Sequence, residues 1–411
     1  MIHTSYWRPR VYPHKGDIPP AQIDRLQDLS ASVTLNREKI REIGRDGTVD
    51  WRKKVPSVRV TARQLEYGDI EFWQKLANVA GNDTDITLND FKTSKVDIVG
   101  YKTDDSGTFL GSVWYPKLRT SGFGINIGDP QAYIERNFDF VGEDEIIFQG
   151  DNKYFNYQRF PASGGAPESF TVNSPSPVVD PDNSGQYLLK VLRVNVSDGT
   201  TDDLTYTTGT ASGTNYAFSA PSTLTVATSA GDVIKVYYTA ATFNTQTQSA
   251  VFTNNDTDAG SLIAEAASIY LYVSSDNYVY KLQSVGIDVS FDRSDYYEIG
   301  NKEVIQTGIR EKTVRVTLGR ILEAYTIEEV LRGAVANYGK LDPREFGDAI
   351  TLRVKCYGSH LKNTFNIGYK MTNLSPTGFD NGVPLNDYVT RGASLEGEDL
   401  TISSSEATIN A

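Results

Sequence analysis

The sequence predicts a mainly β protein with two tandem copies of one β-sandwich or open-barrel unit, each with a flanking helix, and an all-β domain inserted between them. Three observations support this. Residues 25–61 and 281–317 match at 11 of 37 positions without a gap, where unrelated segments would match at roughly one position in fifteen. Each copy opens with alternating apolar and polar residues, as in a half-buried strand. Residues 161–250 differ from both copies in composition.

The repeat extends well beyond its first strand and sets the expected domain boundaries. At one constant offset, 42–44 matches 298–300 as Glu-Ile-Gly, and 58–61 matches 314–317 as Val-Arg-Val-Thr. After a slip of one residue, Arg136 still meets Arg391. Each copy is then about 120 residues long, an ordinary domain size. We expect a first domain with an N-terminal arm at 1–150, an inserted domain with its linkers at 151–260, and a second copy with a C-terminal tail at 261–411.

Each copy predicts the same order of elements. A strand at 29–35 or 285–291 ends near the Glu-Ile-Gly triplet, and a charged loop follows. A second strand comes next, and then a helix, with Asp69 as N-cap in the first copy. A Thr-Ile-Glu-Glu capping box at 326–329 starts the helix of the second copy. The remaining strands are expected around 58–60 and 314–318, 96–98 and 352–354, 108–109 and 364–365, and 134–140 and 389–395.

The inserted stretch is rich in serine and threonine. Between residues 161 and 250 the only basic side chains are Lys190, Arg193 and Lys235. A proline-rich linker at 174–185 precedes short alternating runs at 187–196 and 233–238. We interpret this stretch as a small Ig-like all-β sandwich that protrudes from the surface.

Composition narrows the function class. With 40 basic and 52 acidic residues, the net charge is −12, which argues against tight sequence-independent binding of nucleic acid. The N-terminus lacks the apolar segment of a signal peptide, and no run of 18 apolar residues suggests a membrane span. The single cysteine, Cys356, excludes an intrachain disulfide and suits a buried strand position. These features are typical of a protein that folds in a cytoplasm.

Residues that could carry chemistry are better interpreted as structural. His3, His14 and His360 have no metal-ligand partners at suitable spacing, so we interpret them as surface or terminal residues. The acidic clusters at 143–145 and 396–399 could form an acid pair or a Ca²⁺ site, but a repeated structural or subunit-contact edge is the simpler hypothesis. Residues 180–185 resemble a Ca²⁺ loop without its closing glutamate. No phosphate loop, nucleophile elbow or dinucleotide fingerprint occurs. We therefore expect no catalytic residues, no cofactor and no metal.

The tryptophans are confined to the first copy and its arm. Core packing accounts for Trp73 on the predicted helix. Trp51 lies in the charged loop after the first Glu-Ile-Gly triplet. For Trp51, a role at an interface and a role in local packing remain equally open.

A strand ending in Glu-Ile-Gly, a long polar loop, a Val-Arg-Val-Thr strand and then a helix resembles the tail-tube fold. This fold is shared by tail tubes of phages and archaeal viruses and by inner tubes of contractile injection systems. The resemblance covers about 240 of the 411 residues. It implies subunits that assemble into stacked rings whose inner strands form one barrel around a channel. Because this chain carries two units, three chains would close a ring with pseudo-sixfold symmetry.

The resemblance implies a structural virion protein rather than an enzyme: a major tail tube protein around a DNA conduit, located in the virion tail and assembled in the host cytoplasm. Alternatives are a baseplate hub or distal tail adaptor with two tube units, and a glycan-binding or glycan-cleaving virion protein acting through the insert. Implied partners are other copies of the chain, a tape measure protein, tail terminator and baseplate proteins, passing DNA that is not specifically bound, and a sheath where the tail has one. No membrane is implied.

The resemblance also assigns two sets of interface residues. The loops at 45–56 and 301–312 would reach the adjacent ring, through Arg45, Asp46, Asp50, Trp51, Arg52, Lys53, Lys302, Glu303, Arg310 and Glu311. The polar strand faces would line the lumen and make it net negative, so that DNA phosphates are repelled. The candidate wall residues are Asp288, Ser290 and Asp292 in the second copy, and Ser30, Ser32, Thr34 and Asn36 in the first.

Overall fold

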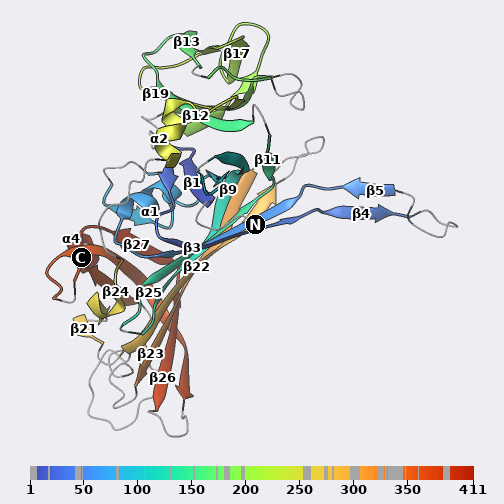
Figure 1. Cartoon of the computed structure of the whole chain (residues 1–411). Coiled ribbons are helices and arrows are strands. Elements are labelled where there is room, and N and C mark those ends of the chain that lie inside the picture. The colour runs from blue at the N-terminus through green and yellow to red at the C-terminus, as the bar shows by residue number, and fades with distance from the viewer. Residues whose placement is uncertain are drawn as a thin grey trace.

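The computed structural model describes most of the chain, and it is mainly β as predicted (Figure 1). The described residues are 7–16, 19–41, 48, 50–79, 83–106, 108–129, 131–150, 153–172, 175–179, 186–195, 200–252, 261–272, 276–279, 282–296, 306–321, 328, 331, 346–347, 349–359, 361–382 and 389–411. His3 and His360, the loop at 180–185 and most of the second predicted helix lie outside them.

The elements follow the chain as three groups, which we call the first copy, the insert and the second copy. The first copy contains β1 (Trp7–Pro13), β2 (Ala21–Gln22), β3 (Leu26–Thr34), β4 (Arg37–Ile40), β5 (Asp50–Lys53), β6 (Ser57–Leu65), α1 (Ile70–Ala77), β7 (Asp85–Thr87), β8 (Val96–Thr103), β9 (Phe109–Ile127), β10 (Glu135–Gly142) and β11 (Ile146–Phe148). The insert contains β12 (Tyr154–Pro161), β13 (Glu168–Thr171), β14 (Leu188–Asn195), β15 (Thr200–Asp203), β16 (Thr205–Tyr206), β17 (Asn215–Ser219), β18 (Thr223–Val226), β19 (Asp232–Ala240) and α2 (Thr245–Phe252). The second copy contains η2 (Ala264–Ala266), β20 (Ala267–Tyr272), β21 (Asp276–Tyr278), β22 (Leu282–Tyr296), β23 (Gln306–Ile321), β24 (Ile350–Tyr357), β25 (Phe365–Gly382), β26 (Thr390–Gly397), β27 (Asp399–Ser403) and α4 (Glu406–Asn410).

One continuous antiparallel sheet runs through both copies. Its strand order is β3-β6-β10-β9 from the first copy, followed by β22-β23-β26-β25 from the second. We call these eight strands the long sheet. The two copies meet where β9 pairs with β22, so the duplicated units share a sheet rather than standing apart.

The first halves of the long strands β9 and β25 belong to a second layer. In the first copy this layer is β2-β1-β8-β9-β11, and in the second it is β21-β20-β24-β25-β27. β7 of the first copy extends the second of these sheets by pairing with β27. The apolar face of the long sheet packs against this layer and α1 in one core. Each copy is therefore a β-sandwich in which one strand turns the corner between the layers.

Strand registers show the duplication directly. Ala31 pairs with Val60 in the first copy, and Ile287 pairs with Val316 in the second, at the same offset that aligns the two sequences. The predicted strand positions are confirmed in both copies. The N-cap is also confirmed, because Asp69 Oδ1 accepts the backbone N–H of Glu71 at 2.8 Å. Trp73 is fully buried on α1, and Cys356 is fully buried on β24, both as predicted.

The insert contains two four-stranded sheets, in line with the all-β prediction, while its likeness to an Ig domain stays a prediction. These sheets are β12-β19-β14-β15 and β13-β18-β17-β16. In Figure 1 the insert caps the end of the molecule above the first copy. The run at 233–238 does not alternate in exposure, however, because every residue of β19 is buried. One face of β19 packs inside the insert, and the other packs on the first copy.

Two further predictions were wrong. The charged loop at 45–56 is partly a strand, because β4 and β5 form a separate two-stranded ribbon that projects from the body (Figure 1). In the first copy β3 therefore ends at Thr34, before the Glu-Ile-Gly triplet, whereas in the second copy β22 continues to Tyr296. Both triplets, at 42–44 and 298–300, lie outside the described residues. His14 is not a surface residue, because the insert covers it and its side chain is 7% exposed.

Candidate assembly interface

The long sheet ends in two strands that are paired on one side only within the described residues. β3 pairs only with β6. At the other end, residues 378–382 of β25 pair with β26 and leave their second side open. A sheet edge exposes a row of unpaired backbone N–H and C=O groups, which can pair with another chain. These two edges are the main candidates for chain-to-chain contact.

The same kinds of edge already meet inside the chain. β22 is the repeat of β3, and β9 is the repeat of β25. The pair β9–β22 runs antiparallel over six positions, from Val285 opposite Ile127 to Ser290 opposite Gly122. The junction between the copies therefore shows how one repeat of the unit pairs with the other within the chain.

Apolar packing reinforces the junction. Phe291 of β22 lies 6.1 Å from Phe91 and 6.3 Å from Phe123, measured between ring centroids, and both of those rings belong to the first copy. Phe291 is 5% exposed and Val289 is 3% exposed. The first copy thus covers the apolar face of the strand that it pairs with.

Arg293 ties the two copies together just beyond the paired segment. Its guanidinium donates to three carbonyl oxygens of the first copy: Thr120 at 2.8 Å, Phe91 at 3.0 Å and Lys92 at 3.4 Å. Hydrogen bonds from a charged donor are stronger than neutral ones. Arg293 therefore acts as a clamp across the junction.

The equivalent residues at the free edge lack this cover. Val33, the repeat of Val289, is 37% exposed, and Leu35, the repeat of Phe291, is 59% exposed. Arg37, the repeat of Arg293, lies exposed on β4. At the other free edge, Phe379 is partly buried, whereas its repeat Phe123 is 2% exposed.

The outer face of the long sheet is polar and mainly acidic. Leaving aside Arg310, which is exposed at the irregularity in the β22–β23 pairing, its described strand residues include eight carboxylates and three guanidinium groups, so their net charge is −5. Partial burial raises the pKa of Asp288, and the nearby Arg315 acts in the opposite direction. The carboxylates are Asp28, Glu135, Asp139, Asp288, Asp292, Glu311, Asp380 and Glu396, and the cations are Arg59, Arg63 and Arg315.

The residues predicted to line a lumen lie together on this outer face. Asp288, Ser290 and Asp292 alternate with buried residues along β22 and are exposed. Ser30, Ser32 and Thr34 repeat the pattern on β3, and Asn36 follows directly, with its amide bonded to the carbonyl oxygen of Val55 at 2.8 Å. Whether this face surrounds a channel stays a prediction.

The structure describes part of the predicted inter-ring set. Trp51 and Arg52 are exposed on the β4–β5 ribbon, together with Asp50. Lys53 pairs with Arg37 in the ribbon ladder. Arg310 and Glu311 are exposed on β23 rather than in a loop. Arg45, Asp46, Lys302 and Glu303 lie outside the described residues.

The indole of Trp51 does not cover the core of its own domain. It is 48% exposed, and its contact is with the Lys39 ammonium group, 5.2 Å from the ring centroid. The ribbon has the same strand register as the second copy. Lys39 pairs with Trp51 in the ribbon, and their repeats Asp295 and Thr307 pair with each other in the second copy. Packing in the domain core therefore does not account for Trp51, while a local role on the ribbon and an interface role both stay open.

Buried ion pairs lie behind the outer face in both copies. Arg136 donates to both oxygens of Glu66 at 3.1 Å, and the hydroxyl of Tyr369 in the second copy donates to the same carboxylate at 2.6 Å. Arg391, the repeat of Arg136, pairs with Glu328, which also accepts from Arg320. The sequence match of these two arginines thus reflects a shared structural role.

The insert is docked firmly on the first copy. Lys190 Nζ donates to both oxygens of Asp97 at 3.2 and 3.0 Å, and His14 Nε2 lies 2.6 Å from Asp97 Oδ1. Lys235 Nζ donates to the carbonyl oxygen of Pro13 at 2.8 Å. An aromatic cluster of Tyr12, Tyr101, Trp114, Phe148, Phe155, Tyr157 and Tyr237 surrounds these polar contacts.

Burial lowers the pKa of His14 to about 4, with Asp97 opposing and Lys190 assisting the shift. Burial alone would raise the pKa of Asp97, but His14 and Lys190 together bring it below its usual range. Burial also lowers the pKa of Lys190, and the neighbouring Asp97 opposes that shift.

In the second copy, α4 covers the surface that the insert covers in the first. Gly368 occupies the register position of Trp114, and a Cβ there would lie 2.6 Å from Ile409 Cγ1 of α4. Ile409 is fully buried. Lys355, the repeat of Val99, reaches Glu406 of α4 at 3.4 Å. The two copies thus share an inner design and differ on their outer surfaces.

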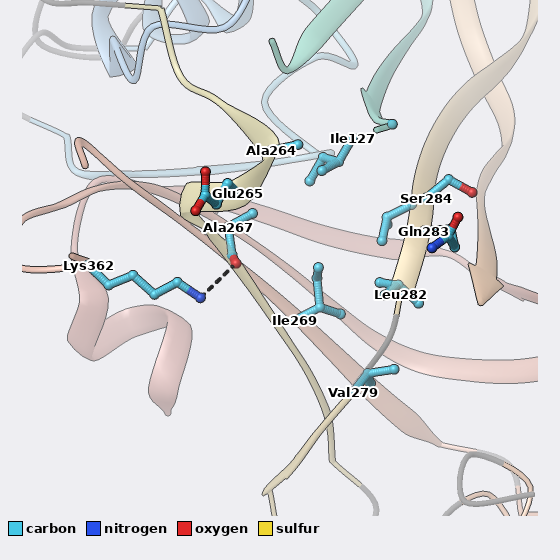
Figure 2. Close-up of a pocket in the computed structure, with 12 residues that line it drawn as sticks. Ile127, Ala264, Glu265, Ala267, Ile269, Val279, Leu282, Gln283, Ser284 and Lys362 are labelled. Carbon is cyan, nitrogen blue, oxygen red and sulfur yellow. Dashed lines mark hydrogen bonds between the residues drawn. The ribbon is translucent and has the colours of Figure 1, made fainter. Parts of the chain in front are cut away.

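A cavity of about 230 Å³ lies at the seam between the copies (Figure 2). Ile127 at the end of β9 faces it from one side, and Leu282, Gln283 and Ser284 of β22 face it from the other. Lys362 at its rim donates to the carbonyl oxygen of Ala267 at 3.1 Å. The lining mixes aliphatic and polar groups.

The predicted acidic clusters form ion pairs with neighbouring strands. Glu143 lies 3.7 Å from Arg119, Glu396 lies 3.0 Å from Arg315, and Asp399 lies 3.6 Å from Lys312. These contacts favour the structural interpretation of both clusters.

In the described part of the chain, no group of three or more His, Cys, Asp or Glu side chains could hold a metal ion. No helix among the described residues is long and apolar enough to cross a membrane.

Comparison with known proteins gives matches among solved structures only. No family model matches the chain, and no curated protein matches its sequence. Similar structures include a chain of the anti-feeding prophage baseplate, with 13% identity, TM-score 0.27, and coverage of 35% of this chain and 92% of that chain. A chain of the anti-feeding prophage tube-terminating cap has 12% identity and TM-score 0.28, with coverage of 38% and 99%. A chain of the PVC sheath–tube complex, from an extracellular contractile injection system, has 19% identity and TM-score 0.25, with coverage of 36% and 93%.

Proposed function

We propose that this chain is a structural protein of a phage-like tail, the major tube protein, and that three chains close a ring around a DNA conduit. The observation that carries the proposal is the long sheet. It consists of two repeats joined edge to edge, and it ends in the same two kinds of edge that meet at its centre. A unit that joins its own repeat in this way can join the next chain in the same way.

Closure removes both exposed edges, as head-to-tail contacts do when their rotation closes. Three sheets of eight strands supply 24 strands to one barrel. The acidic face of the long sheet, which is the outer face in a single chain, would line the inside of this barrel and repel DNA phosphates. The β4–β5 ribbon, which projects from the body, would reach the adjacent ring. Proposed partners are further copies of the chain, a tape measure protein, and terminator, baseplate or sheath proteins in the virion tail.

The direct test is the assembly state of the purified chain. Light scattering coupled to size exclusion should give a species with three times the 45.4 kDa chain mass, or larger stacks. Negative-stain images should show rings with a central hole. A folded monomer that persists at high concentration across a range of salt would contradict the proposal.

A baseplate hub or distal adaptor is the second candidate, because the two copies differ on their outer surfaces. One carries the insert and the other carries α4, so a trimeric ring would present a threefold exterior suited to a junction. Copy number separates the two roles. Quantitative mass spectrometry of purified particles should find many copies of a tube protein and a single ring of a hub protein.

A further inference from the structure

We infer that the contact between chains copies the internal β9–β22 junction residue by residue, with β3 of one chain paired to β25 of the next and Arg37 as the clamp. This inference rests on the proposed ring, and it adds a register and a positioning residue. The occupant of each free edge is therefore a second copy of this chain.

The register follows from the constant offset between the two copies. Inside the chain, Asp288 lies opposite Gly124. Their repeats are Ser32 on β3 and Asp380 on β25, both exposed. The equivalence of β9 and β25 is supported by their partners, because Phe123 pairs with Phe138 as Phe379 pairs with Ala393. Ser32 of one chain should then lie opposite Asp380 of its neighbour.

Facing side chains can also be inferred from the internal junction. A Cβ added to Gly124 would lie 2.8 Å from Asp288 Oδ1, so the two positions point to the same side of the sheet. The equivalent side chains of Ser32 and Asp380 should therefore meet on the polar face. This makes the pair suitable for a disulfide, which needs Cβ atoms about 3.5–4.5 Å apart.

The apolar side of the contact has a matching set of residues. Phe346 and Phe379 form an edge-to-face pair at 5.4 Å, as Phe91 and Phe123 form a pair at 5.3 Å. Phe91 and Phe123 cover Phe291, whose repeat is the exposed Leu35. Phe346 and Phe379 of the neighbouring chain should cover Leu35 in the same way.

Arg37 should supply the remaining contact of the junction between chains. Arg293 donates to the carbonyl oxygens of Thr120 and Phe91 across the internal junction. The repeat of Thr120 is Pro376, and Phe346 occupies the place of Phe91 beside its ring partner. Arg37 should therefore donate to the carbonyl oxygens of Pro376 and Phe346 in the next chain. Its identity with Arg293 is one of the 11 matches in the repeat.

Oxidative cross-linking tests the register. The double variant Ser32→Cys/Asp380→Cys should form covalent dimers and trimers that resolve on non-reducing gels, and ring images should be unchanged. The matched control is Asp28→Cys/Asp380→Cys, which keeps both thiols on the polar face but moves one of them about 13 Å along β3. Equal or better cross-linking of the control would overturn the register while leaving ring formation, and hence the proposed function, intact.

Arg37→Ala tests the clamp. The concentration needed for half-maximal ring assembly should rise about tenfold or more, as for truncation of an interface arginine, and the melting temperature of the unassembled chain should stay the same. Arg41→Ala, four residues further along, is the control and should assemble normally. Normal assembly of Arg37→Ala would overturn the clamp. If no wild-type rings form at all, the proposed function and this inference fail together.

Discussion

Trp51 is the clearest case of a large aromatic side chain that the described part of the chain leaves exposed. Its indole is 48% exposed on a ribbon that stands away from the core. Trp73, by contrast, is fully buried against Phe123 and Phe138. The same residue type thus has two different surroundings, and the difference can be tested by truncation.

Trp51→Ala should shorten tubes without unfolding the chain. An exposed truncation away from the core usually changes the unfolding free energy by less than about 0.5 kcal/mol. Loss of an aromatic anchor at a subunit contact commonly costs about 2 kcal/mol or more. Thermal melts paired with electron microscopy should show unchanged melting, intact single rings and fewer stacked rings. Trp73→Ala is the contrasting variant and should lose about 3–5 kcal/mol of stability. Tubes of normal length with Trp51→Ala would rule out the stacking role.

His14 predicts a specific pH dependence of stability. Its pKa is lowered to about 4 in the folded chain, while an unfolded histidine titrates near 6.5. Between these values the unfolded state binds more protons, so stability falls as the pH falls from about 6.5 to 4. Chemical denaturation across this range should show a loss of roughly 1–3 kcal/mol from this group. His14→Gln should remove that part of the slope, and an identical slope in both proteins would contradict the linkage.

At the scale of elements, the sequence predicted the features that depend on local residue order, such as strands with alternating apolar and polar residues. The strands at 29–35 and 285–291 and the N-cap Asp69 follow from residue order alone. The β4–β5 ribbon was missed because its charged residues resemble a loop, and its pairing depends on register carried outward from β3 and β6. The sequence analysis also did not predict that β9 is one strand shared by both layers of the sandwich.

The candidate assembly site was predictable only in part. The polar face of β22 follows from its alternation, but the exposure of Leu35 depends on β3 being an edge. Burial of His14 depends on Lys190, which lies 176 residues away in the sequence. No local pattern encodes that contact. The clamp residue Arg293 was visible as a repeat match with Arg37, but its carbonyl partners required the structure.

The insert should be dispensable for ring formation only if the surface beneath it is repaired. It lies on the side of the first copy away from the long sheet, so its removal leaves both free edges intact. Simple deletion of residues 153–252 with a Gly/Ser bridge would expose Trp114 and Phe148, and large apolar patches promote aggregation.

The second copy suggests the repair, because it carries Lys355 where the first carries Val99. A deletion combined with Val99→Lys and Trp114→Ser should stay soluble and form rings, whereas the plain deletion should aggregate or melt earlier. Size exclusion and electron microscopy distinguish these outcomes. A repaired deletion that folds but does not assemble would place the insert in the ring interface.

For the whole molecule, the charge of the long sheet predicts how assembled rings treat DNA. With a net charge of −5 per chain on the polar face, wild-type tubes should not bind labelled duplex DNA even at about 50 mM salt. Asp139→Lys, Asp288→Lys and Asp292→Lys together change this face from −5 to +1. The triple variant should bind DNA at low salt and release it as salt rises, as anisotropy would show. Salt-sensitive binding by the wild type would contradict an acidic conduit.

The two copies carry different structures on their outer surfaces, and this difference has a consequence for imaging. Because the insert sits on one copy and α4 on the other, a closed ring of three chains is threefold on its outside while its barrel is close to sixfold. In a helical reconstruction, strong low-radius density would then follow sixfold selection rules, and density at high radius would follow threefold rules. Imposing sixfold averaging would smear the insert to half occupancy at six sites. A map refined with threefold symmetry should instead show three full-strength knobs per ring.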